Sequence, residues 1–193
     1  MVGKERRETI APLAGRVLEV GFGTGLNLPY YPHAVTRLTA IDSERMLPKR
    51  VAQRIAEARM PVEQLQLDAS GKLPFEDKMF DGVVTTFTLC SISDVASALT
   101  EIRRVLKPDG QYVFLEHGRS DDQRIAKWQE LLNPVQRVVA CGCNLNRAID
   151  GLIRESRFEI VKLERYLMPE VPRIFGETYR GVAQPQIKGD GNG

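Results

Sequence analysis

Short apolar runs alternate with segments of helical periodicity along most of this chain. The runs with strand character cover residues 17–20, 35–41, 62–67, 80–86, 111–115, 158–165 and 179–183. One segment between them carries a regular apolar stripe, preceded by Asp94 as a helix cap, at Val95, Ala98, Leu99, Ile102, Val105 and Leu106. Strands that alternate with helices in this way are typical of βαβ units and a parallel sheet. The pattern therefore predicts an α/β fold.

The remaining segments complete the expected map of the chain. In chain order they are a helix at 44–58, a stop and turn at 106–110, a helix pattern at 123–140 that breaks at Asn133-Pro134, and a helix at 148–153 capped by Asn146. No linker or internal repeat divides the sequence. We expect residues 1–185 to form a single domain and residues 186–193 to be a disordered tail.

Composition and charge argue against several classes of protein. The chain has 193 residues and a formal net charge of +2, and its basic residues are scattered, so a nucleic-acid partner is not expected. No apolar run reaches the length of an integral membrane segment, and the charged N-terminus lacks the apolar core of a signal peptide. Three cysteines do not indicate a disulfide scaffold, which favours the cytoplasm. The sequence does not indicate an oligomeric state, and a monomer is the default.

A glycine-rich loop follows the first predicted strand. Gly21, Gly23 and Gly25 alternate directly after the apolar run that ends at Val20. Glycine suits a sharp turn off a strand and the close approach of a ligand to the backbone. The dinucleotide fingerprint G-x-G-x-x-G would need a third glycine where Leu26 stands, which argues against an NAD-dependent oxidoreductase.

Acidic residues follow the second and third predicted strands. Asp42, with Ser43 beside it, stands about 20 residues after the first glycine, where a carboxylate accepts hydrogen bonds from ribose hydroxyls. The alternative is an ordinary helix cap. Asp68 and Ala69 stand at the end of the third strand, and a turn aspartate is the alternative there.

The order of these motifs resembles that of the class I S-adenosylmethionine (SAM) dependent methyltransferases. The resemblance covers residues 14–118 and rests on the glycine loop with Glu19 before it, Asp42, Asp68, Phe80-Asp81 and the Leu-Lys-Pro-Asp-Gly run from Leu106. It implies a Rossmann-like three-layer sandwich whose mostly parallel seven-stranded sheet has an antiparallel last strand. It also implies SAM as cofactor, held by Glu19, Gly21, Gly23, Gly25, Asn27, Asp42, Ser43, Asp68, Ala69 and Thr86.

The later motifs resemble one branch of that family more than others. These are Leu89-Cys90-Ser91, Glu116-His117, Trp128-Gln129 with Asn133-Pro134, Gly142–Arg147 and Arg180–Ala183. They are similar to the alkyl thiol methyltransferases and, more distantly, to the ubiquinone and menaquinone C-methyltransferases. The mammalian thiol enzymes carry an N-terminal membrane anchor that this sequence does not show.

We expect a small-molecule acceptor, with a thiol as the first guess. Its site is predicted from Phe87, Leu89, Cys90, Trp128, Asn144, Asn146 and Arg147. A thiol with a pKa near 8.5 ionises readily, whereas an oxygen or carbon acceptor needs a general base. His117 is the residue best placed for that role, with a structural histidine as the equal alternative. A C- or O-methyltransferase of a quinone-like or lipid substrate and a non-catalytic SAM-binding regulatory subunit stay open.

Three further features have competing interpretations. The segment from Gln123 to Ala140 is interpreted as a lid or packing helix in preference to a weak membrane-surface contact. Cys141 and Cys143 have C-x-C spacing and the chain has two histidines, so we expect no metal site. Arg147 suits a thiolate, although a surface charge is the simpler interpretation.

Overall fold

The structure is a computed structural model that describes residues 2–44, 46–139 and 142–186. Its strands are β1 (Gly15–Val20), β2 (Val35–Asp42), β3 (Val62–Gln66), β4 (Phe80–Thr86), β5 (Leu106–His117), β6 (Phe158–Leu167) and β7 (Glu177–Pro185). Its helices are α1 (Val2–Ile10), the short 3₁₀ helix η1 (Leu28–Tyr30), α2 (Pro48–Ala56), α3 (Val95–Val105), α4 (Gln123–Val139), α5 (Ile149–Glu155) and α6 (Arg173–Gly176). Within these ranges, every helix is too short or too polar to cross a bilayer.

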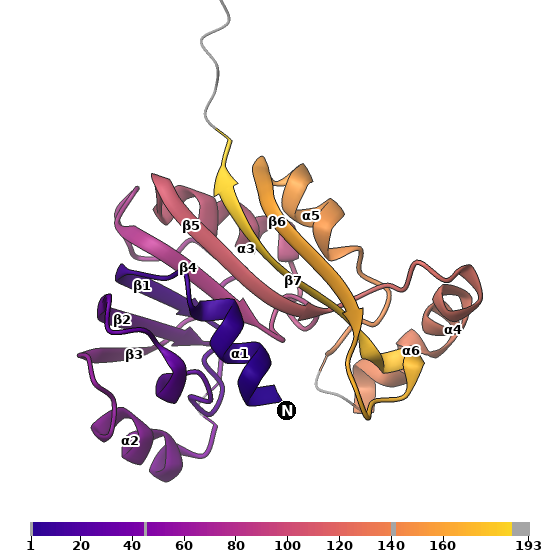
Figure 1. Ribbon diagram of the computed structural model, residues 1–193, viewed down its shortest axis with the longest axis horizontal. Coiled ribbons are helices and arrows are strands. Elements are labelled where there is room, and N and C mark those ends of the chain that lie inside the picture. The colour runs from indigo at the N-terminus through magenta and orange to yellow at the C-terminus, as the bar shows by residue number, and fades with distance from the viewer. Residues whose placement is uncertain (1, 45, 140–141, 187–193) are drawn as a thin grey trace, which may run out of the picture.

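The described strands form one seven-stranded sheet in the order β3-β2-β1-β4-β5-β7-β6 (Figure 1). β1 pairs in parallel with β2 and β4, and the parallel pairing continues outward to β3 and β5. β7 runs antiparallel to both of its neighbours, β5 and β6. The predicted mostly parallel sheet with an antiparallel last strand is therefore confirmed. The order changes direction next to β1, which is where open α/β sheets bind ligands.

Two apolar cores lie on opposite faces of the sheet. Leu18 packs with α3 and α5 on one face, whereas its neighbour Val17 packs with Ile10 of α1 on the other. This alternation follows from the two-residue period of a strand. Both faces of β1 and β4 are covered, and most residues of both strands are buried.

Two predicted boundaries were wrong near the middle of the chain. The helix expected from Glu44 begins at Pro48, because the Asp42 carboxylate accepts a hydrogen bond from the Glu44 N–H (3.1 Å) and holds a turn there. The turn expected at 106–110 belongs to β5. Phe80 pairs with Leu106 and Gly82 pairs with Gln111, so the extra residues bulge out of the strand pair.

The expectations for the C-terminal third need similar corrections. α4 continues through Pro134, so the predicted break is wrong. Asn146 does not cap α5, whose N-cap is Ala148, and instead donates to the Glu130 carboxylate at 2.8 Å. The sequence did not predict α1 or α6. The expected tail lies outside the described residues apart from Gln186, and so does the expected last residue of the α4 helix, Ala140.

Candidate functional site

A cleft of about 540 Å³ lies at the carboxyl ends of the central strands. It is lined by residues from the loops after β1, β2, β3 and β4 and by one residue of α1. The lining includes the predicted cofactor residues Gly21, Gly23, Asp42, Ser43, Asp68, Ala69 and Thr86. The volume is within the usual range for a pocket that holds a small organic molecule.

The glycine loop and the acid after β2 are joined directly. The Gly23 N–H donates to the Asp42 carboxylate at 2.7 Å, so the two motifs meet at the cleft. Gly23 has a φ of +54°, and a Cβ at this position would meet nothing within 4 Å. Gly21, with a φ of +79°, differs because a Cβ there would lie 2.1 Å from the Thr88 hydroxyl. Gly23 therefore keeps the cleft open, and Gly21 allows the loops after β1 and β4 to touch.

Three predicted cofactor residues lie outside the lining. Gly25 packs against Phe22 and Leu28, whereas Glu19 and Asn27 are buried beneath the loop. The Asn27 amide bridges the Glu19 carboxylate and the Thr86 hydroxyl, at 2.9 Å to each. Burial raises the pKa of Glu19 to about 7, although hydrogen bonds from Tyr31 and Asn27 oppose that rise. These groups brace the loop from below.

Arg6 of α1 is a cleft residue that the sequence did not predict. Its guanidinium donates to the Asn27 side-chain oxygen at 2.8 Å and lies 5.5 Å from the centre of the Phe87 ring. Its Nε is buried and has no partner among the described residues. Burial lowers the pKa of Arg6, while the nearby Glu19 carboxylate opposes that shift. No local pattern marked this residue, since it lies in a charged segment far from the glycine loop.

Phe87 separates His117 from the cleft. Phe87 lines the cleft with a φ of +55°, and its ring stacks on the His117 imidazole with centres 4.4 Å apart. His117 is not part of the lining. Burial lowers its pKa, and its Nδ1 has no hydrogen-bond partner in the described part of the chain. The lowered pKa favours the neutral imidazole, which stacks against the phenyl ring.

The segment after β4 is held from behind by buried polar groups. The Glu116 carboxylate accepts hydrogen bonds from the Thr88 and Leu89 N–H groups at 2.9 and 3.1 Å. Burial raises the pKa of this carboxyl to about 7. Arg147 donates to the carbonyl of Leu89 and, at 2.8 Å, to that of Ile92. Arg147 is therefore not a free surface charge, and its guanidinium fixes the loop that borders the cleft.

Most of the predicted acceptor residues do not line the cleft. Only Phe87 does, and the rest of the expected set, Leu89, Cys90, Trp128, Asn144, Asn146 and Arg147, lies outside. Leu89 and Cys90 are buried, and Trp128 is 58% exposed on the outer side of α4. Asn144 donates to the Cys90 carbonyl at 2.8 Å, so its amide braces the same loop. Thr88, Ser91, Ile92 and Ser93 of the same segment also line the cleft.

Comparison with protein families and curated proteins gives consistent matches. A family model described as a methyltransferase domain matches residues 18–114. The chain is 33% identical to human thiol S-methyltransferase TMT1A, over 79% of this chain and 64% of that protein. It is 31% identical to rat thiol S-methyltransferase TMT1B, over 85% and 70%. It is 32% identical to phosphatidylethanolamine N-methyltransferase of Cereibacter sphaeroides, over 81% and 78%. The match thus spans just under two thirds of TMT1A.

Solved structures share the fold at lower sequence identity. The [4+2]-cyclase SpnF superposes with a TM-score of 0.71 at 21% identity, covering 96% of this chain and 80% of its own. The 1,6-didemethyltoxoflavin N1-methyltransferase of Burkholderia thailandensis, solved with bound S-adenosylhomocysteine, gives 0.69 at 17% identity, covering 96% and 78%. At these identities the likeness concerns the fold.

Proposed function

The chain belongs to the methyltransferase domain family and is a SAM-dependent methyltransferase, and from this premise we propose that its acceptor is a small molecule carrying a thiol. Two of the relatives above are named thiol S-methyltransferases. The observation that supports a SAM-dependent activity is the cleft itself. It combines open space over Gly23, the carboxylates of Asp42 and Asp68, and the guanidinium of Arg6.

These residues fit the donor groups of the cofactor. The carboxylates of Asp42 and Asp68 suit the ribose hydroxyls and the adenine amino group, which are hydrogen-bond donors. The unpartnered Nε of Arg6 suits a carboxylate, which is the charge at the amino-acid end of SAM. The cofactor supplies a methyl group on a positively charged sulfur and leaves as a neutral thioether. We propose that Asp42 and Ser43 hold the ribose, Asp68 and Ala69 the adenine, and Arg6 the carboxylate.

The chain's own residues would mainly orient the acceptor. A neutral leaving group needs no acid, and a thiol near its pKa needs little help to ionise. Phe87, Thr88 and Ile92 line the cleft from the segment after β4, where Phe87 lies next to Arg6, and the Phe87 and Ile92 side chains suit an apolar acceptor. His117 touches the back of Phe87, so we propose that it positions this ring.

A lipid acceptor is the second candidate. It is favoured by the similarity to phosphatidylethanolamine N-methyltransferase over 81% of the chain. An oxygen or carbon acceptor, such as a quinone-like ring, would need a base, and His117 would then have to reach the acceptor past Phe87. A regulatory subunit without turnover is the remaining alternative.

The deciding experiment is turnover against a panel of acceptors, measured as release of S-adenosylhomocysteine. The panel contains an alkyl thiol, the matching alcohol, a quinol and phosphatidylethanolamine in micelles. We expect the thiol to react fastest, with a rate that rises with pH as the free thiol ionises. Turnover of the alcohol, quinol or lipid alone would refute the thiol, and SAM binding without any turnover would favour the regulatory subunit.

We also propose that residues 1–185 act as a single domain in a cytoplasmic monomer. Three cysteines without a disulfide framework support a reducing compartment. One sheet carries all of the described strands, which supports a single cooperative unit. Light scattering during gel filtration measures the mass of the particle. A particle of twice the chain mass would overturn the monomer.

A further inference from the structure

Helix α4 presents apolar side chains outward. Val138 is 86% exposed, and the other members of the row are also exposed. They follow helical spacing and form one stripe, here called the outer stripe, made of Trp128, Leu131, Val135, Val138 and Val139. Among the described residues, no other element covers this side of α4. A helix packed on a protein core has the opposite arrangement.

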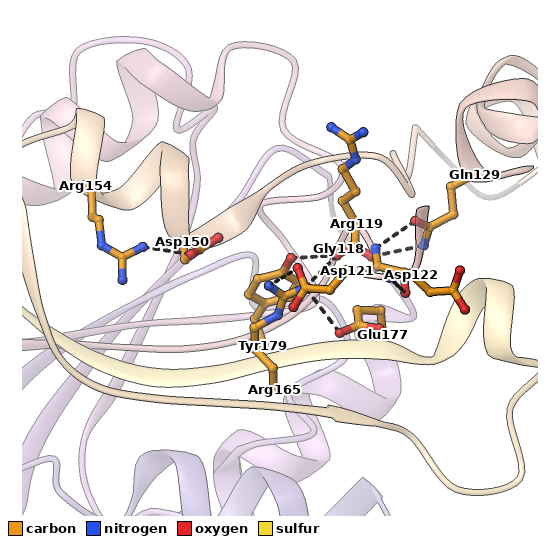
Figure 2. A network of polar contacts seen from close by, with 11 residues as sticks. Gly118, Arg119, Asp121, Asp122, Gln129, Asp150, Arg154, Arg165, Glu177 and Tyr179 are labelled. Atoms are coloured by element: carbon orange, nitrogen blue, oxygen red, sulfur yellow. Dashed lines mark hydrogen bonds and ion pairs between the residues drawn. The ribbon is translucent and has the colours of Figure 1, made fainter. Parts of the chain in front are cut away.

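The inward face of α4 buries Ala126 and two polar residues that are hydrogen-bonded to the domain. Gln129 is buried, accepts a hydrogen bond from the Ser120 N–H at 2.8 Å, and donates to the Gly118 carbonyl at 3.1 Å (Figure 2). Asn133, one turn further on, accepts from the Leu145 N–H at 2.8 Å. Hydrogen bonds therefore hold α4 on the domain, and the outer stripe is not needed for that attachment.

Basic side chains accompany the outer stripe. Arg124, Lys127 and Arg137 are exposed on α4, whereas its single acidic residue, Glu130, accepts a hydrogen bond from Asn146. By helical spacing, Arg124 lies in line with the stripe and Lys127 lies beside it. Two copies of this face would bring like charges together, while an anionic surface would pair with them.

We propose that the outer stripe of α4 docks on an anionic lipid surface. Figure 1 shows α4 at the margin of the molecule, with α6 on its domain side and its far side free of other ribbons. A helix of 17 residues is about 25 Å long and would lie in the plane of the interface with its apolar side inserted. The stripe is a row of exposed side chains on a single helix, which suits a lipid surface.

This contact would lie next to the acceptor end of the cleft. Asn133 donates to the Asn144 side chain at 3.3 Å, and Asn144 donates to the Cys90 carbonyl at 2.8 Å. The next residue, Ser91, lines the cleft. The lipid contact rests on the exposure and charge of α4 and does not depend on the identity of the methyl acceptor.

Trp128 makes the test direct, because it is the only tryptophan in the chain. The full chain is mixed with vesicles of phosphatidylcholine alone or with added phosphatidylglycerol, and both flotation and Trp128 emission are measured. We expect flotation and a blue shift with the anionic vesicles, weakened by salt. Val138→Glu should weaken partitioning about tenfold or more. Lys127→Gln should weaken it about fivefold, which corresponds to the loss of one basic residue at the surface.

Val161→Glu is the matched control, since Val161 is also exposed but lies on the edge strand β6. It should partition like the wild type, and all variants should bind S-adenosylhomocysteine normally. The proposal is overturned if no flotation occurs or if Val138→Glu and Val161→Glu float equally. It is also overturned if the wild-type chain does not bind vesicles but forms dimers that Val138→Glu dissociates. A second copy of the chain would then occupy the outer stripe.

Discussion

Gly23 and Gly21 provide a sharp test of where the cofactor lies. Both residues have positive φ and both line the cleft, but the space beside them differs. A methyl group at Gly23 would enter open space, whereas one at Gly21 would overlap Thr88. If the cofactor rests on the backbone of this loop, Gly23→Ala should act mainly on binding and Gly21→Ala mainly on folding.

The size of each effect follows from the local geometry. Placing alanine at the left-handed φ of Gly23 costs about 1–2 kcal/mol, or about 2–8 °C in Tm for a chain of this size. Overlap of the new methyl with bound cofactor costs about another 1–3 kcal/mol, which raises Kd about 5- to 150-fold. Gly21→Ala has the same backbone cost, and overlap with Thr88 adds about 1–3 kcal/mol to the destabilisation of the folded chain itself.

The assay combines calorimetric titration of S-adenosylhomocysteine with thermal unfolding of the ligand-free protein. We expect Gly23→Ala to lose affinity with a small fall in Tm, and Gly21→Ala to show the larger fall in Tm. Thr88→Ala combined with Gly21→Ala should recover part of that loss, because two of the overlapping atoms are removed. An unchanged Kd for Gly23→Ala would show that the cofactor does not lie on this loop.

Four further predictions follow from the same site. Asp42→Ala should weaken SAM binding by about 1–3 kcal/mol in calorimetry, and an unchanged Kd would remove the ribose assignment. Arg6→Ala should weaken SAM binding by about 1.5–3 kcal/mol. Arg7→Ala, on the exposed side of α1, is the control and should leave SAM binding unchanged. If Arg6→Ala changes only the KM for the acceptor, Arg6 belongs to the acceptor site instead. Burial raises the pKa of Glu19 from an ordinary 4.5 to about 7, so the carboxyl holds its proton more tightly in the folded chain than in the unfolded chain. The wild type therefore loses stability as pH rises through this range. The free energy of unfolding of Glu19→Gln, measured by urea titration, should therefore rise relative to that of wild type by on the order of 3 kcal/mol between about pH 5 and pH 8. If the unfolding free energies of the two proteins change with pH in parallel, the prediction is wrong. His117→Ala should change kcat/KM with a thiol only slightly, and a loss of about 10²–10⁴-fold would make it the general base.

The strands and the central helix were predictable because their signals are local. β4 was expected at 80–86 and has these bounds, since a strand buried on both faces has an apolar, valine-rich centre. Asp94 was expected to cap the next helix, and its carboxylate accepts the Ser97 N–H at 3.0 Å. Short polar side chains at helix starts act on the nearest N–H groups, so the sequence alone defines the contact.

The turn at 106–110 and the break at Pro134 failed because their outcome depends on neighbours. A Pro-Asp-Gly run stops a helix, but the chain then either turns or bulges according to its pairing, and here Leu106 already pairs with Phe80. Pro134 removes one helical hydrogen bond, yet Gln129 and Asn133, in the turn before it, fix α4 to the domain. Such contacts come from distant segments and leave no mark at the site of the error.

The cofactor side of the site was easier to predict than the acceptor side. Gly23, Asp42 and Asp68 lie in the cleft because strand ends meet at one edge of a parallel sheet, so their positions follow from the strand order. Arg6 reaches the cleft only through the packing of α1, which the sequence did not predict. Trp128 was expected at the acceptor because its motif resembles the thiol methyltransferase branch, but α4 turns this side chain outward and is attached through polar residues.

Three residues of the later sequence motifs have a common arrangement in the structure. Glu116, Asn144 and Arg147 do not touch the cleft, but each binds the backbone of the segment after β4. That segment presents Phe87, Thr88, Ser91 and Ile92 to the cleft, so its shape sets the space left for an acceptor. Glu116 and Arg147 carry opposite charges and bind the same stretch of backbone. The Glu116 carboxylate accepts from N–H groups, and the Arg147 guanidinium donates to carbonyl oxygens. A change in this bracing would therefore shift the cleft wall without altering any side chain in it, and acceptor choice would respond to residues that never meet the acceptor.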